Sequence, residues 1–187
     1  MQQAIEEAVR VLRNGGLILY PTDTVWGIGC DAANAEAVER IYTLKRSQNK
    51  KSMLVLCQSA DMVVRYVHRA PGVAFEVMEM ASSPLTLILP GAAGLAPNLI
   101  PEEGTLGVRV PDHAFCQGML ARLGRPIVST SANLTGEPAP AKLPEVAREI
   151  LDGVDLVVSP RYEGKPTGRA SAIILFNEDA SFRIIRE

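Results

Sequence analysis

The sequence is poor in the residues that build metal clusters and disulfide frameworks. It has three cysteines and two histidines in 187 residues. The cysteines, Cys30, Cys57 and Cys116, stand alone and are odd in number, so they predict neither a CxxC pair nor a disulfide framework. Unpaired cysteines suit the reducing cytoplasm, which is where we expect the protein. A metal site of histidine and cysteine is likewise not expected.

Long apolar stretches and a leader pattern are also missing. No apolar run approaches the roughly 20 residues that cross a bilayer. The first residues, MQQAIEEAVRVLRNGG, carry glutamates where a signal peptide has a basic start and an apolar middle. We therefore expect no membrane association. A net charge of −2 and a pI of about 5.8 argue against a surface that is basic throughout, and leave room for a local basic patch.

The chain does contain enough apolar residues to fill a core. Hydrophobic residues make up 47% and charged residues 21% of it, a balance typical of a folded globular protein. At this length a single domain, residues 1–187, is the default prediction.

Apolar periodicity predicts helices and strands that alternate along the chain. Helices are expected over residues 2–13, 34–45, 59–80 with a break at Pro71-Gly72, 113–123 and 144–151. Strands are expected over residues 17–20, 52–57, 85–90 and 106–111, at the start of PIVSTSAN, and in DLVVS, SAIILF and FRIIR. This order predicts an α/β or α+β fold in which helices cover a sheet.

Two of the expected strands run directly into turns rich in hydroxyl groups. They are GLILYPTDT and RPIVSTSAN. Open sheets of this class commonly bind ligands beyond the carboxyl ends of their strands, so both turns are candidates for a ligand site. The hydroxyls of STSANLTG could line a phosphate or a nucleotide. Capping of a helix or of the turn itself is the commoner role of such a cluster.

The segment TLKRSQNKKSM concentrates positive charge in an otherwise slightly acidic protein. Lys45, Arg46, Lys50 and Lys51 lie within seven residues of one another. They make a local anion site plausible. A solvated charged loop is the usual alternative for a lone basic run.

Arg109 lies inside the apolar strand segment GVRVPDH, where an unpaired guanidinium would be costly. It therefore needs a protein carboxylate, or a carboxylate or phosphate ligand that its planar fork can bind through two hydrogen bonds. The chain has no GxxxxGK[ST] loop, no GxGxxG after a strand and no defensible Ser/His/Asp arrangement. The residues alone thus predict an α/β protein that binds an anion or nucleotide, and they leave its reaction open.

Six segments, in order, carry a resemblance to the YrdC/Sua5 family that covers nearly the whole chain: PTDTVWGIG, LKRSQNKKSM, SPLTLILPG, LGVRVPDH, PIVSTSAN and SAIILF with the later IIR. The resemblance implies the short, single-domain form of the family. It also implies a twisted, mixed open sheet with helices packed on it and a central concave groove. The implied activity is L-threonylcarbamoyladenylate synthesis. Threonylcarbamoyl-AMP and pyrophosphate form from L-threonine, bicarbonate or CO2, and ATP, and the product serves the threonylcarbamoyladenosine modification of tRNA.

The family's functional residues carry over to matching positions. No enzyme nucleophile is implied, and Lys45 is the best candidate for stabilising the phosphates. Contacts to the amino-acid substrate are implied for Thr24, Arg109 and Ser129. Contacts to the nucleotide are implied for Lys45, Lys51, Thr105, Ser131, Asn133 and Arg186.

Three positions depart from the family pattern, all on the nucleotide side. Ser47 stands where the family has the arginine of its K-x-R segment, and Arg46 is shifted from that place by one residue. Ala139 and Ala172 each stand where a hydroxyl is expected. Lys50 and Lys51 are the candidates to replace the missing charge.

Magnesium is the expected cofactor, held mainly by ATP, because departing pyrophosphate needs its charge neutralised. Asp23 is the nearest acidic residue, and an Asx-type turn is its favoured interpretation over metal binding. Trp26 is expected to pack and His113 to begin a helix.

The expected partners are tRNA or double-stranded RNA and the proteins of tRNA modification. The alternatives are a non-catalytic RNA-binding or ribosome-associated module, and a paralogue that uses another amine or carbamoyl donor.

Overall fold

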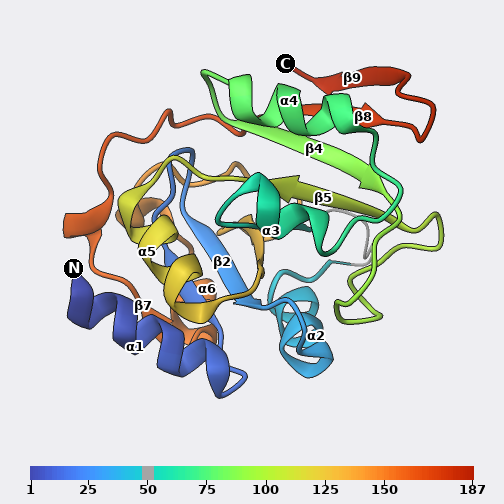
Figure 1. The fold of residues 1–187 in the computed structure, drawn as a ribbon. Coiled ribbons are helices and arrows are strands. Elements are labelled where there is room, and N and C mark those ends of the chain that lie inside the picture. The colour runs from blue at the N-terminus through green and yellow to red at the C-terminus, as the bar shows by residue number, and fades with distance from the viewer. Residues whose placement is uncertain (48–52) are drawn as a thin grey trace.

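A computed structural model describes residues 1–47 and 53–187. Within these ranges nine strands form one mixed sheet in the order β7-β1-β2-β6-β3-β5-β4-β8-β9 (Figure 1). Three neighbouring pairs are parallel, namely β7/β1, β3/β5 and β4/β8, and the others are antiparallel. The strands are β1 (Ile18–Tyr20), β2 (Gly27–Asp31), β3 (Leu54–Leu56), β4 (Leu85–Pro90), β5 (Thr105–Arg109), β6 (Ile127–Ser131), β7 (Leu156–Val157), β8 (Ala172–Phe176) and β9 (Phe182–Arg186).

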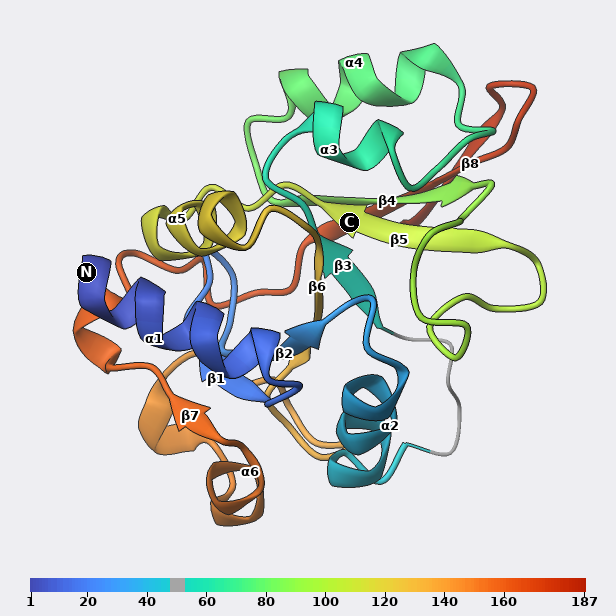
Figure 2. The same ribbon diagram turned by 60° about the horizontal axis from the view of Figure 1, so that its bottom comes forward.

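Helices pack around this sheet and begin where the sequence offers a cap. Asn34 accepts a hydrogen bond from Ala37 N at 3.0 Å and so starts α2. Figures 1 and 2 show α1 beside α5 next to β1 and β2, and α3 with α4 next to β4. The helices are α1 (Gln2–Arg13), α2 (Ala35–Leu44), α3 (Ala60–Val64), α4 (Gly72–Met80), α5 (Ala114–Leu123) and α6 (Arg148–Gly153), with 3₁₀ turns η1 (Leu143–Glu145) and η2 (Pro160–Tyr162).

The central strands are buried on both faces. Alternate residues of β1 belong to different apolar clusters: Ile18 and Tyr20 pack with α1 and α5, whereas Leu19 packs with α2 and the middle of the sheet. Successive side chains of a strand point to opposite faces, so both faces of β1 are covered. Burial on both faces explains why the segment LILY is apolar at consecutive positions.

The sequence predicted most of these elements, and the mixed sheet with packed helices is confirmed. His113 precedes α5, and its ring accepts a hydrogen bond from Cys116 N at 3.5 Å, as expected for a residue that begins a helix. Two predicted helices are shorter than expected: residues 59–80 form only α3 and α4, and residues 144–151 hold the end of η1 and the start of α6. No helix in the described part of the chain is both long and apolar enough to span a bilayer.

Strand β2 is not among the strands that the sequence predicts. Glycine is a poor strand former, and two of the five residues of β2 are glycines. In the structure Gly27 and Gly29 sit inside a fully buried strand between β1 and β6. Pairing on both sides supplies the stability that the local residues lack.

Candidate functional site

A cavity of about 420 Å³ opens where the turn after β1 meets β5, β6 and the C-terminal strands. Residues far apart in sequence, from Thr22 to Arg186, contribute to its walls. Six of the nine residues assigned to substrates by resemblance line it: Thr24, Thr105, Arg109, Ser129, Ser131 and Arg186. Three strands, β5, β6 and β9, and the turn after β1 therefore bring most of the predicted site into a single cavity.

The turn of PTDT is shaped by Thr22. Its Oγ1 accepts hydrogen bonds from Thr24 N at 3.0 Å and Val25 N at 3.3 Å, and donates to Val25 O at 2.7 Å. A second segment fixes the same turn from outside, since Thr167 N donates to Asp23 O and Gly168 N to Thr24 O. The turn predicted at Asp23 is thus built by the threonine before it.

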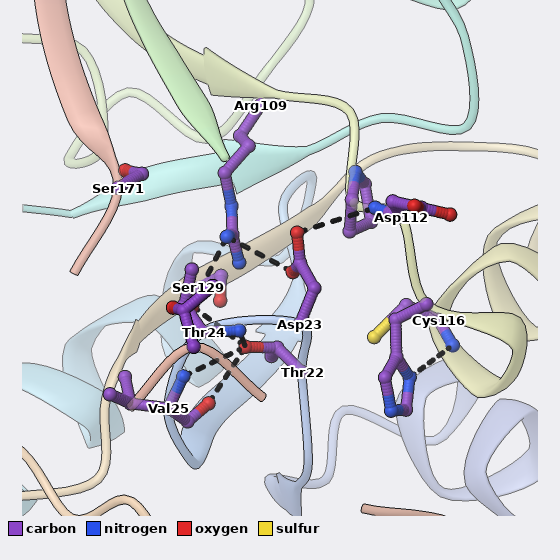
Figure 3. A network of polar contacts seen from close by, with 12 residues as sticks. Thr22, Asp23, Thr24, Val25, Arg109, Asp112, Cys116, Ser129 and Ser171 are labelled. Atoms are coloured by element: carbon purple, nitrogen blue, oxygen red, sulfur yellow. Dashed lines mark hydrogen bonds and ion pairs between the residues drawn. The ribbon is translucent and has the colours of Figure 1, made fainter. Parts of the chain in front are cut away.

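Asp23 instead faces Arg109. The two side chains are buried, and Arg109 Nη1 lies 3.1 Å from Asp23 Oδ1 and donates to Thr24 Oγ1 at 3.1 Å (Figure 3). The Asx-turn interpretation of Asp23 was therefore wrong, because the carboxylate neutralises the buried guanidinium. Arg109 Nε has no hydrogen-bond partner among the described residues. A guanidinium has five N–H donors, so Arg109 retains donors for a ligand carboxylate.

The opposite wall is held together by hydroxyls and the last strand. Thr86 Oγ1 and Ser171 Oγ are 2.7 Å apart, and Arg186 Nε donates to Ser171 O at 2.9 Å. All three residues line the cavity. Sequence reasoning did not assign Thr86, although a lone threonine inside the apolar run LTLILP was a usable signal.

Trp26 both packs and lines the cavity. It is 1% exposed, and its indole Nε1 donates to Glu163 Oε1 at 2.8 Å. The hydrogen bond satisfies the one polar atom of the buried ring. Glu163 thereby links the turn after β1 to the chain that precedes β8.

Lys45 lies beneath the cavity wall, and the cavity lining does not include it. Its Nζ donates to Ser131 O at 2.5 Å and to Asn133 O at 2.6 Å, while Thr135 N and Oγ1 donate to Lys45 O. Lys45 is 6% exposed, and burial lowers the pKa of its ammonium to about 8. In this arrangement it holds the loop after β6 in place.

The remaining nucleotide-side residues lie away from the cavity walls or outside the described chain. Asn133 donates to Leu134 O and Glu137 O, and its Oδ1 is buried without a partner among the described residues. Arg46 forms an exposed ion pair with Glu149 at 2.6 Å, which directs it to α6. Lys51, with Lys50, lies outside the described residues. The nucleotide roles of Lys45, Lys51 and Asn133 remain predictions.

The buried position of Lys45 predicts a pH dependence of stability. A lysine in the unfolded chain titrates near 10.5, and Lys45 titrates near 8 in the folded protein. Between these values the unfolded chain binds more protons, so the free energy of unfolding should rise as pH increases from about 8 to about 10.5, by up to about 3 kcal/mol. Urea unfolding across this range, compared with Lys45→Gln, checks the prediction. Parallel curves for the two proteins would contradict it.

Comparison with known proteins places the chain in a family. The family model of Sua5, YciO and YrdC proteins, described as "Telomere recombination", matches residues 10–187. The chain belongs to the Sua5/YciO/YrdC family. A threonylcarbamoyl-AMP synthase of Xanthomonas euvesicatoria pv. vesicatoria is 35% identical to it, over 98% of this chain and 97% of the relative.

Solved structures of the Sua5/YciO/YrdC family share the fold. E. coli YciO is 28% identical, with a TM-score of 0.82, over 100% of this chain and 90% of that chain. Sua5 of P. abyssi, crystallised with L-threonine, is 26% identical with a TM-score of 0.84. The match covers 92% of this chain and 50% of the Sua5 chain, so this chain spans half the length of that protein.

Proposed function

We propose that this chain is an L-threonylcarbamoyl-AMP synthase. The observation that carries the proposal is the cavity, which gathers two arginines and several hydroxyls in a family whose relatives bear that name. A family member of known structure has been crystallised with L-threonine. The names of the relatives favour this catalytic function over the non-catalytic RNA-binding module.

The reaction needs positioning and charge stabilisation. The amine of threonine combines with CO2, or with bicarbonate and loss of water, to give a carbamate. A carbamate oxygen attacks the α-phosphorus of ATP, and the bond to pyrophosphate breaks. Because the substrate supplies the nucleophile, the enzyme has only to hold two anions together and to stabilise charge on the phosphoryl oxygens.

The cavity residues divide between the two substrates. We place the threonine carboxylate at Arg109, beside Thr24 and Ser129, where the buried guanidinium has donors to spare. The nucleotide would lie toward Thr105, Ser131 and Arg186, on the far strands of the same cavity. Among the described residues, Arg186 is the cation that lines this wall.

Magnesium would enter with ATP. Among the described residues no group of three or more histidine, cysteine, aspartate or glutamate side chains could hold a metal ion, and Asp23 is occupied by Arg109. Mg²⁺ is commonly held by phosphates and water with few protein ligands, which fits such a site. Its charge would neutralise the leaving pyrophosphate.

The partners follow from the product. Threonylcarbamoyl-AMP is a reactive mixed anhydride, so we propose that it passes to proteins of tRNA modification in the cytoplasm. Direct contact with tRNA or double-stranded RNA is a further proposal. Binding that weakens steeply with salt would support it.

Pyrophosphate release from ATP and Mg²⁺ tests the function. We expect release that requires both L-threonine and bicarbonate, with serine and glycine as control amines. Release with another amine in preference to threonine would point to the paralogue. Absence of release, together with absence of threonine binding, would contradict the proposal.

A further inference from the structure

Tyr20, the last residue of β1, is not among the residues assigned to substrates, yet its hydroxyl reaches one of them. The side chain is fully buried, and the hydroxyl donates a 2.7 Å hydrogen bond to Ser129 Oγ on β6. Strands β1 and β6 are not neighbours, because β2 lies between them. Strands two apart in a sheet are about 9.5 Å from each other, too far for side chains that stand perpendicular to the sheet.

Two glycines of β2 make this contact possible. Tyr20 is paired with Gly27 and Ser129 with Gly29, so all four residues share one face of the sheet. A Cβ on Gly29 would lie 2.9 Å from Tyr20 Cε1, and a Cβ on Gly27 would lie 3.5 Å from Tyr20 Cζ. The ring therefore leans across β2 over the space that the glycines leave. This accounts for the spacing of the two glycines in WGIG.

The hydrogen bond sets the direction of the serine proton. Burial raises the pKa of the Tyr20 phenol, so the hydroxyl keeps its proton at neutral pH and donates it to Ser129 Oγ. A serine hydroxyl has one proton and two lone pairs. With a lone pair turned to Tyr20, the Ser129 proton is left to point elsewhere, and Ser129 lines the cavity.

We propose that Tyr20 is a positioning residue that fixes Ser129 as a hydrogen-bond donor to an anionic oxygen of the amino-acid substrate. The oxygen belongs to the carboxylate or to the carbamate formed on the amine. The inference rests on the proposed function and specifies the polarity of one contact within it. Figure 3 shows Ser129 next to Thr24, whose hydroxyl accepts the hydrogen bond from Arg109. The Ser129 hydroxyl and the Arg109 guanidinium, both hydrogen-bond donors, therefore face the same part of the cavity.

A double-mutant cycle of Tyr20→Phe and Ser129→Ala tests the inference. Threonine affinity is measured by calorimetry, without and with bicarbonate, and ATP affinity is measured alongside. Tyr20→Phe should weaken threonine binding about tenfold, the effect of one hydrogen bond to a charged group. Added to Ser129→Ala, Tyr20→Phe should weaken threonine binding no further. Tyr20→Phe should leave ATP affinity unchanged. A loss without bicarbonate assigns the contact to the carboxylate, and a loss only with bicarbonate assigns it to the carbamate.

Tyr42→Phe is the matched control. Tyr42 is also buried, its hydroxyl donates to Asn98 O at 3.4 Å, and it does not line the cavity, so its threonine affinity should equal that of the wild type. Equal losses from Tyr20→Phe in both backgrounds, or equal losses for threonine and ATP, would overturn the positioning role, because they describe a general loosening of the fold. Wild-type protein that binds no threonine would overturn the proposed function itself.

Discussion

Arg109→Ala should lower kcat/KM for threonine by about 100-fold or more while ATP affinity stays near that of the wild type. Hydrogen bonds to charged groups contribute about 1.5–3 kcal/mol each, and a bidentate pair with the threonine carboxylate would be lost. Arg109→Lys should retain only part of the wild-type kcat/KM for threonine, because an ammonium keeps the charge but lacks the planar fork. Initial rates of pyrophosphate release against threonine concentration give the measurement.

Loss of Arg109 also leaves Asp23 buried without its cation, which should cost about 3–5 kcal/mol of stability. Arg125→Ala separates the two effects. Arg125 pairs with the buried carboxylate of Asp31 and does not line the cavity. It should destabilise the protein without changing threonine affinity. Equal losses of threonine and ATP affinity in Arg109→Ala would exclude Arg109 as the carboxylate contact.

Gly29→Ala should be among the most damaging single-methyl changes in the chain. The added Cβ would lie 2.7 Å from Val128 O on β6 and 2.9 Å from the ring of Tyr20. The first neighbour is backbone of a paired strand and cannot move aside without breaking the ladder. We expect a loss of about 3 kcal/mol, near the upper end for overpacked cores, and a melting temperature lower by roughly 6–12 °C.

Gly72→Ala is the control for Gly29→Ala. Gly72 begins α4, and a Cβ there would meet no atom of the described residues within 4 Å. Alanine also restricts the unfolded chain, so this variant should be unchanged or up to about 1 kcal/mol more stable. Thermal and urea unfolding of both variants measure the two changes in stability. A Gly29→Ala protein as stable as the wild type would show that β2 and β6 can separate at this point, contrary to the packing described above.

Local patterns predicted the elements that bury a face or carry a cap. The periodic apolar residues of 2–13 and the cap at Asn34 need only neighbours in sequence, and both helices formed there. Strand β2 could not be predicted in this way. Its two glycines have little strand propensity, and what fixes them is pairing with β1 and β6, which come from distant parts of the chain.

The candidate site could likewise be predicted from the sequence only in part. Motif resemblance selected residues from Thr24 to Arg186, and six of them line one cavity. Side-chain identity could not tell which of them face it. Lys45 is a cation in a basic segment, yet its Nζ turns to the carbonyls of Ser131 and Asn133.

The sequence by itself determined the residue types of the site and the strands that end beside it. Short-range periodicity and turn formation depend only on residues that are close together in sequence. Only the tertiary structure decided that Asp23 neutralises Arg109 and that Tyr20 reaches Ser129 across two glycines. Each of these contacts joins residues more than 80 positions apart. Their geometry depends on strand order and register, which long-range packing sets.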